Sequence, residues 1–119
     1  MVVQDPAVVQ QLAQVHPYCR HVLQAGTAVV VCAKPALQGS GNAFWPQDCG
    51  AAVENILLQA LDLGYGTCWC GVYPDENRTQ SVQRVLQVDS IPVALVVLGV
   101  ADEAPEARGF YEAEKVKWI

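Results

Sequence analysis

Along this chain, stretches with apolar residues at helical spacing alternate with short apolar runs typical of strands. Asp5 and Pro6 read as a helix N-cap followed by proline at the first helical position, and valines and a leucine follow at helical spacing until Pro17. This pattern predicts an amphipathic helix. A shorter helical piece is expected over residues 18–24, with Gly26 as its terminator.

Two apolar runs are typical of buried strands. "TAVVVCA" (27–33) and "IPVALVVLGV" (91–100) are continuous rather than alternating, which predicts strands covered on both faces. A stable sheet usually needs three or more strands. We therefore expect the 66–72 segment, the C-terminal tail or a second chain to complete it, and the alternating "KVKWI" at the end predicts an edge strand.

The longest helical pattern runs from Pro46 to Leu63 and ends at Gly64. Its apolar positions surround almost the whole circumference, which predicts a central, buried helix or one that forms a dimer interface. Residues 34–45 are rich in Gly, Pro, Ser and Asn and predict a loop, whereas 74–87 predict another helix. Helices alternating with buried strands indicate a single layered domain of α/β or α+β class.

The amino-acid composition of the chain indicates which kinds of binding partner to expect. Hydrophobic residues make up 52% of the 119 residues and charged ones only 16%, which favours a homo-oligomer that covers apolar surface. The net charge is -5 and the seven basic residues are scattered, so nucleic-acid binding is not expected. No apolar run approaches membrane-spanning length and the start lacks a secretion signal, which predicts a cytoplasmic protein with reduced cysteines.

The stretch "LGYGTCWCGVYP" (63–74) holds the candidate chemistry. A metal site could combine Cys68 and Cys70 with Cys49, His16 or His21. Structural zinc sites need four ligands, and this Cys-x-Cys stands alone without a second pair, so a metal site is disfavoured.

Two other kinds of site are also disfavoured. Five cysteines and two histidines allow many nucleophile and base pairings, but no local signature selects one, and both histidines are expected at the surface. Gly64, Gly66 and Gly71 miss the spacing of dinucleotide-binding and P-loop motifs and follow a helix rather than a strand. A helix C-cap followed by a tight turn explains the first two glycines.

The segment "WPQDCGAAVENILLQALDLGYGTCWCGVYP", followed by a helix, "IPVALVVLGVADE" and "ARGFYEAEKVKWI", resembles the C-terminal half of the flavin-dependent nitroreductase family. "VVQDPAVVQQLAQVHPY" and "AVVVCA" also resemble segments of that family. The resemblance implies an α+β layered domain with a small mixed sheet and a central buried helix. It further implies a homodimer with that helix at the interface and FMN bound between the subunits.

The resemblance also implies site residues. The turn after the long helix lies along the flavin ring in this family, which assigns FMN contacts to Cys68, Trp69, Cys70, Gly71 and Val72. The Gly71 amide is the expected donor to flavin N5, where hydride enters and leaves, so no catalytic side chain is required. Trp69 and Cys70 are expected to supply apolar surface under the ring.

Arg108 in "ARGF" is the candidate partner of the FMN phosphate, since a guanidinium suits bidentate pairing, and Lys115 is a second candidate. The alternative for Arg108 is a tail charge that offsets Glu103 and Glu106. The Arg-Ser-x-Arg and Asn-x-Gln-Pro-Trp segments of the family do not occur in the sequence. We therefore expect a domain truncated at its N-terminus: a fragment, a shortened relative or a chain completed by another protein.

The expected function is an FMN-dependent NAD(P)H oxidoreductase that reduces nitroaromatics, quinones or similar small acceptors in a ping-pong cycle. The alternative is a cofactor-free remnant that acts as a structural or interaction module. Residues 101–119 are expected to form an extended tail that can be swapped onto the partner subunit.

Overall fold

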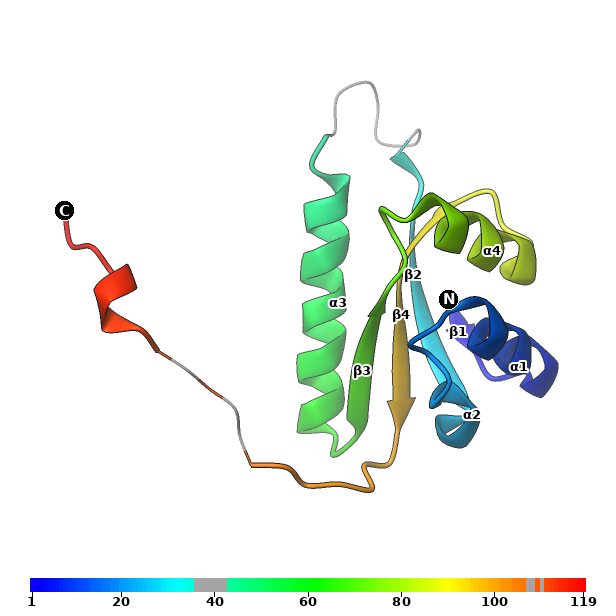
Figure 1. Cartoon of the computed structure of the whole chain (residues 1–119), viewed down its shortest axis with the longest axis horizontal. Helices are drawn as coiled ribbons and strands as arrows, with labels where there is room; N and C mark the ends of the chain where they lie inside the picture. The colour runs from blue at the N-terminus through cyan, green and yellow to red at the C-terminus, as the bar shows by residue number, and fades with distance from the viewer. Residues whose placement is uncertain (36–42, 107–108, 110) are drawn as a thin grey trace.

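The computed structural model describes residues 1–35, 43–106, 109 and 111–119 (Figure 1). Their helices and strands follow the predicted order closely. The elements are β1 (Val2–Val3), α1 (Pro6–Val15), α2 (Val22–Ala25), β2 (Thr27–Ala33), α3 (Trp45–Asp62), β3 (Gly66–Gly71), α4 (Glu76–Leu86), β4 (Ile91–Gly99) and the 3-10 helix η2 (Ala113–Lys115).

The strands form one sheet in the order β1-β2-β4-β3, and each neighbouring pair is antiparallel. The expected α+β class is confirmed, but the expected mixed sheet is wrong for the described strands. β2 and β3 run in the same direction because both pair with β4 in the opposite direction. They are not neighbours, since β4 lies between them, and so no parallel ladder forms.

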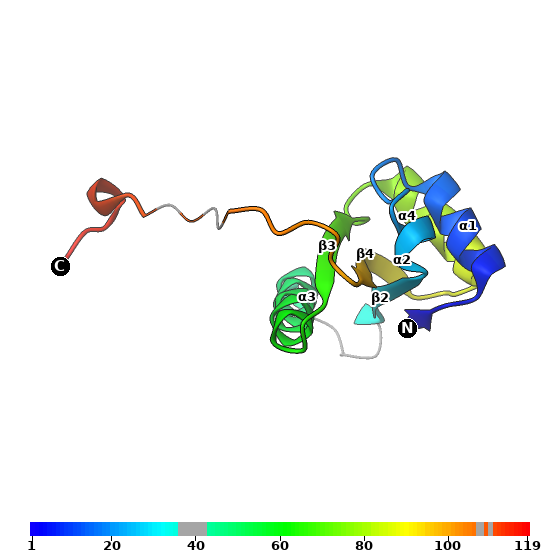
Figure 2. The ribbon, with the colours of Figure 1, turned by 90° about the horizontal axis from the view of Figure 1, so that it is seen from below.

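Helices cover both faces of the sheet. α3 lies against one face, while α1, α2 and α4 lie against the other (Figures 1 and 2). The larger core cluster fills the second side and includes Leu12, Val22, Cys70, Val72 and Leu95. On the α3 side, Val53 packs with Ala94 and Val96 of β4.

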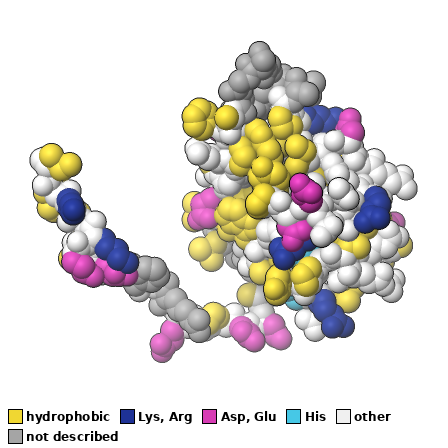
Figure 3. All heavy atoms as spheres, turned by 45° about the horizontal axis from the view of Figure 1, so that its top comes forward, with side chains coloured by type: hydrophobic (Ala, Val, Ile, Leu, Met, Phe, Trp, Pro, Cys, Tyr) yellow, Lys and Arg dark blue, Asp and Glu magenta, His cyan; other side chains and the backbone are white. Residues whose placement is uncertain are grey.

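α3 is less buried than its apolar pattern predicts. Only Val53 and Ala60 of this helix are buried, whereas Leu58 is 55% exposed and Leu61 is 71% exposed. Figure 3 shows hydrophobic side chains gathered on the surface over this part of the molecule. The expectation of a central buried helix is therefore wrong for the single chain, because the sheet covers only one side of α3.

The C-terminal tail leaves the body of the domain after β4 (Figures 1 and 2). Residues 116–119 form no strand, so the edge strand predicted for "KVKWI" is wrong. Trp118 is 92% exposed. The sheet gains its fourth strand at the other end of the chain, where Val2 and Val3 pair with β2 and the Met1 amino group donates to the Val30 carbonyl at 2.8 Å.

Three predicted helix ends are confirmed, whereas the short helix predicted over 18–24 begins only at Val22. Asp5 caps α1, since its Oδ1 accepts hydrogen bonds from the N–H groups of Ala7 and Val8. Gly26 ends α2 with φ 69°, and Gly64 follows α3 with φ 81°, both in the left-handed region that favours glycine. Among the described residues, none of these helices combines the length and apolar character required to cross a bilayer.

Candidate functional site

The backbone of Gly71 faces the free edge of the sheet. Among the described residues, β3 pairs only with β4, and the Val72 N–H donates to the Val93 carbonyl at 3.0 Å. In an antiparallel pair, residues that point their N–H and C=O groups at the partner alternate with residues that point them away. Gly71, opposite Ala94, is therefore of the second kind, with both polar groups directed away from β4.

The carbonyl of Gly71 is held by two side chains. It lies 2.8 Å from His16 Nε2 and accepts a hydrogen bond from Arg78 Nη1 at 3.3 Å. The Tyr18 N–H donates to His16 Nδ1 at 3.3 Å, so the imidazole proton is assigned to Nε2, which donates to Gly71. These contacts fix the orientation of the peptide between Gly71 and Val72.

His16 was expected at the surface, and that prediction is wrong. Its side chain is fully buried. His16 is the C-cap of α1 with an extended backbone, and Pro17 follows it, so the chain turns there and the ring reaches β3. A histidine beside a helix-ending proline was visible in the sequence, but its partner lies 55 residues away.

Arg78 is fixed beside Gly71 by contacts on two sides. Its Nε lies 3.3 Å from Asp75 Oδ2, and its guanidinium carbon lies 5.6 Å from the centre of the Tyr18 ring. Asp75 also caps α4 by accepting from the Arg78 N–H at 3.0 Å. The start of α4 therefore places a positive charge next to the free edge of β3.

Open space and aromatic side chains border this edge. In the part of the chain that the structure describes, no heavy atom lies within 4 Å of the position that a Cβ of Gly71 would take. Tyr73 packs against Trp45 of α3 with 4.8 Å between ring centres. Trp69 lies on the α3 side, where its Cη2 would be 3.9 Å from a Cβ placed on Gly50. An outward backbone donor beside open space suits a flat ligand with a hydrogen-bond acceptor at its edge.

Four of the five residues predicted to contact FMN lie in β3, and the fifth, Val72, directly follows it. The segment is therefore a strand rather than the expected turn. Side chains alternate between the two faces of a strand. Cys70 and Val72 are buried in the core with α1 and α4, whereas Trp69 is on the opposite face and 44% exposed. The prediction that Trp69 and Cys70 together lie under one ring is therefore wrong.

The two candidate phosphate ligands are not brought to Gly71 in the described part of this chain. Arg108 lies outside the described residues. Lys115 belongs to η2 in the extended tail, where it pairs with Glu112 at 2.6 Å (Figures 1 and 2). Among the described residues, Arg78 is the basic side chain that the structure records in contact with Gly71.

All five cysteines are free thiols. A hydrogen bond from Cys70 lowers the pKa of Cys19, while the same contact and burial raise the pKa of Cys70. Burial also raises the pKa of Cys68. Cys68 and Cys70 therefore stay protonated at neutral pH, which disfavours a thiolate nucleophile on β3.

A family model described as "Nitroreductase family" matches residues 2–100. A protein from Methanothermobacter thermautotrophicus, whose name combines NADH dehydrogenase and NAD(P)H nitroreductase, is 35% identical over 99% of this chain and 64% of its own length. A protein of the same name from Archaeoglobus fulgidus is 37% identical over 96% of this chain and 65% of its own length. The chain thus spans just under two thirds of both curated relatives.

Solved structures of similarly named proteins superpose on almost the whole of this chain. A crystal structure from Bacteroides thetaiotaomicron, named as the same kind of protein, superposes with a TM-score of 0.90 at 29% identity, covering 99% of this chain and 69% of the other. An FMN-dependent nitroreductase from Clostridium difficile superposes with a TM-score of 0.86 at 26% identity, covering 99% and 72%. Together with the family match over most of the sequence, these likenesses show that the chain belongs to the nitroreductase family.

Proposed function

We propose that this chain is an FMN-dependent NAD(P)H oxidoreductase that reduces nitroaromatics, quinones or similar small acceptors in a ping-pong cycle. The observation that carries the proposal is the outward-facing Gly71 backbone at the free edge of β3, next to open space. The similar Clostridium difficile structure is named as FMN-dependent, which supports the same cofactor here.

When bound, FMN supplies the redox chemistry, since hydride is taken up and given away at N5 of its ring. The Gly71 N–H serves as the hydrogen-bond donor at that atom. A donor fixed in advance is effective because it needs no reorganisation as charge develops. The peptide that carries this N–H joins Cys70 to Gly71 within β3, and pairing with β4 holds it. His16 and Arg78 hold the next peptide, whose carbonyl belongs to Gly71.

The other predicted FMN contacts keep more limited roles. Cys70 and Val72 act through the strand backbone, because their side chains are buried, while Trp69 offers ring surface on the α3 side. Cys68 is exposed on the same strand. Arg108 remains the proposed partner of the FMN phosphate, on the basis of the family resemblance. A cytoplasmic location likewise stays a prediction from the sequence.

A homodimer completes the proposal. In the single chain, several leucines of α3 and the apolar end of the tail are exposed to solvent. A second subunit that packs against them would remove this apolar surface from water. We assign α3 to the interface between subunits and residues 101–119 to a tail that extends onto the partner, where Arg108 and Lys115 can reach a site shared between subunits.

Leu61→Glu should convert the dimer into a monomer. Leu61 is 71% exposed in the single chain, so the charge does not disturb its fold, but in the dimer the carboxylate would be buried without a partner. Sedimentation analysis at micromolar concentration measures the change. Gln59→Glu adds the same charge to a different side of α3 and should leave the dimer intact. Equal masses for wild type and Leu61→Glu would contradict an α3 interface.

An absorbance scan of the purified protein, repeated after addition of FMN and then NADPH without oxygen, tests the function. Flavin bands that co-purify or appear on the protein, and that bleach with NADPH, are expected. A protein that stays colourless after gel filtration with excess FMN would instead support the cofactor-free remnant. The exposed apolar surface of α3 is the observation that favours this alternative, since it suits an interaction module as well as an enzyme.

A further inference from the structure

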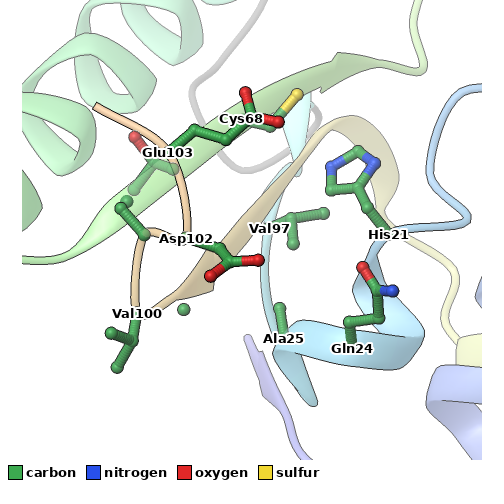
Figure 4. A pocket seen from close by; sticks show the side chains of 12 residues that line it. His21, Gln24, Ala25, Cys68, Val97, Val100, Asp102 and Glu103 are labelled. Carbon is green, nitrogen blue, oxygen red and sulfur yellow. The ribbon is translucent and has the colours of Figure 1, made fainter. Parts of the chain in front are cut away.

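Two short sequence motifs meet on the side of the sheet that faces α2. One is Cys19-Arg20-His21, just before α2, and the other is Cys68-Trp69-Cys70 on β3. A ring nitrogen of His21 and the sulfur atoms of Cys68 and Cys70 all lie within 4.8 Å of one another. Figure 4 shows His21 and Cys68 facing each other across a hollow.

Cys19 extends this group to four. Its thiol is close enough to that of Cys70 for each to shift the pKa of the other, so Cys19 lies next to the same cluster from the buried side. Cys19 is fully buried and Cys70 nearly so, while Cys68 and His21 are exposed. Each of the two segments therefore supplies one buried and one exposed residue to the cluster. The segments are distant in sequence, since position 68 lies 47 residues after position 21.

We propose that Cys19, His21, Cys68 and Cys70 form a tetrahedral zinc site. Three thiolates and one imidazole are an established structural zinc set, and Cys-x-His now supplies the second pair that Cys-x-Cys lacks by itself. Zinc–sulfur bonds of about 2.3 Å at tetrahedral angles place ligand sulfur atoms about 3.8 Å apart. For His21, Cys68 and Cys70, the observed upper limit of 4.8 Å is close enough that side-chain rotation can close the remainder, and Cys19 joins them through its contact with Cys70.

The surroundings suit a cation. His21 and Cys68 line a hollow of about 720 Å³ whose wall also includes Asp102 and Glu103 from the segment after β4 (Figure 4). The hollow gives an ion a path from solvent to the cluster. The two carboxylates add negative potential along it.

Thiol protons must leave when the ion binds. Zinc deprotonates thiols that coordinate it and releases the protons to solvent.

The site is separate from the flavin proposal. The Cys68 and Cys70 side chains point to the opposite face of β3 from Trp69, and the polar backbone groups of Gly71 point along the edge. Bound zinc would fasten the corner between α1 and α2 to β3. Its expected effect is structural stabilisation, whether or not the protein binds FMN.

The experiment is a metal titration of the reduced, chelator-treated full chain under anaerobic conditions. Cobalt(II) should bind one ion per chain with the absorption of a tetrahedral thiolate complex, zinc should displace it, and zinc should raise the melting temperature. Cys68→Ser and His21→Ala change exposed ligands and should fold normally. Each should weaken zinc binding by more than about 100-fold, because even an outer-shell partner is worth about 10- to 100-fold.

Cys49→Ser is the matched control, since Cys49 lies at the start of α3 beside Cys32, in a different hollow. This variant should bind zinc as the wild type does. Failure to bind cobalt or zinc stoichiometrically would overturn the proposal. So would unchanged zinc affinity in Cys68→Ser, or an equal loss of affinity in Cys49→Ser.

Discussion

Gly71→Pro should fold and lose FMN-dependent NADPH oxidation by roughly 100- to 1,000-fold, the effect of removing one donor from a site of developing charge. Proline removes the backbone N–H. That N–H points away from β4, so no bond of the sheet is lost, and proline is tolerated on an edge strand with this orientation. The rate is measured as kcat at saturating FMN, with circular dichroism to confirm the fold.

Gly71→Ala is the matched control. A Cβ at this position meets open space, and the N–H remains. Replacing glycine by alanine in a compatible backbone stabilises a protein by about 0.4–1 kcal/mol, so this variant should be at least as stable as the wild type. It should keep most of the activity. Equal rates in the proline and alanine variants would show that the Gly71 amide is not the donor at N5.

Elements with a strong local pattern were predictable from the sequence. The strand predicted over 27–33 coincides with β2, and the helix predicted over 46–63 is shifted by one residue from α3. Asp5, Gly26 and Gly64 marked helix ends because their effects are confined to one turn of backbone. β1 escaped prediction because two residues are too short to carry an alternating pattern.

The candidate site was predictable only in part, because its geometry depends on contacts between distant segments. The stretch around Gly71 was identified from glycines and family resemblance. Nothing local to His16 indicates that its ring reaches a carbonyl 55 residues away, or that His21 meets Cys68. For α3, the pattern indicated that its apolar side chains are buried. It could not distinguish burial within the same chain from burial against a second chain.

His16→Ala should lower the free energy of unfolding by about 2–4 kcal/mol, the range for a buried side chain that leaves both a cavity and unpaired polar groups. The imidazole is fully buried and bridges two parts of the backbone. Without it, the Tyr18 N–H loses its acceptor and the Gly71 carbonyl keeps only Arg78. Urea denaturation measures the loss.

Two further variants separate packing from hydrogen bonding. His16→Phe refills the space but makes neither bond, so it should recover part of the stability and still weaken FMN binding, because the peptide that follows Gly71 keeps only its bond to Arg78. His21→Ala, measured with chelator present, removes an exposed histidine five residues away and should change stability by less than about 0.5 kcal/mol. If His16→Ala costs no more stability than His21→Ala, the buried hydrogen bonds of His16 do not hold the Gly71 carbonyl in place.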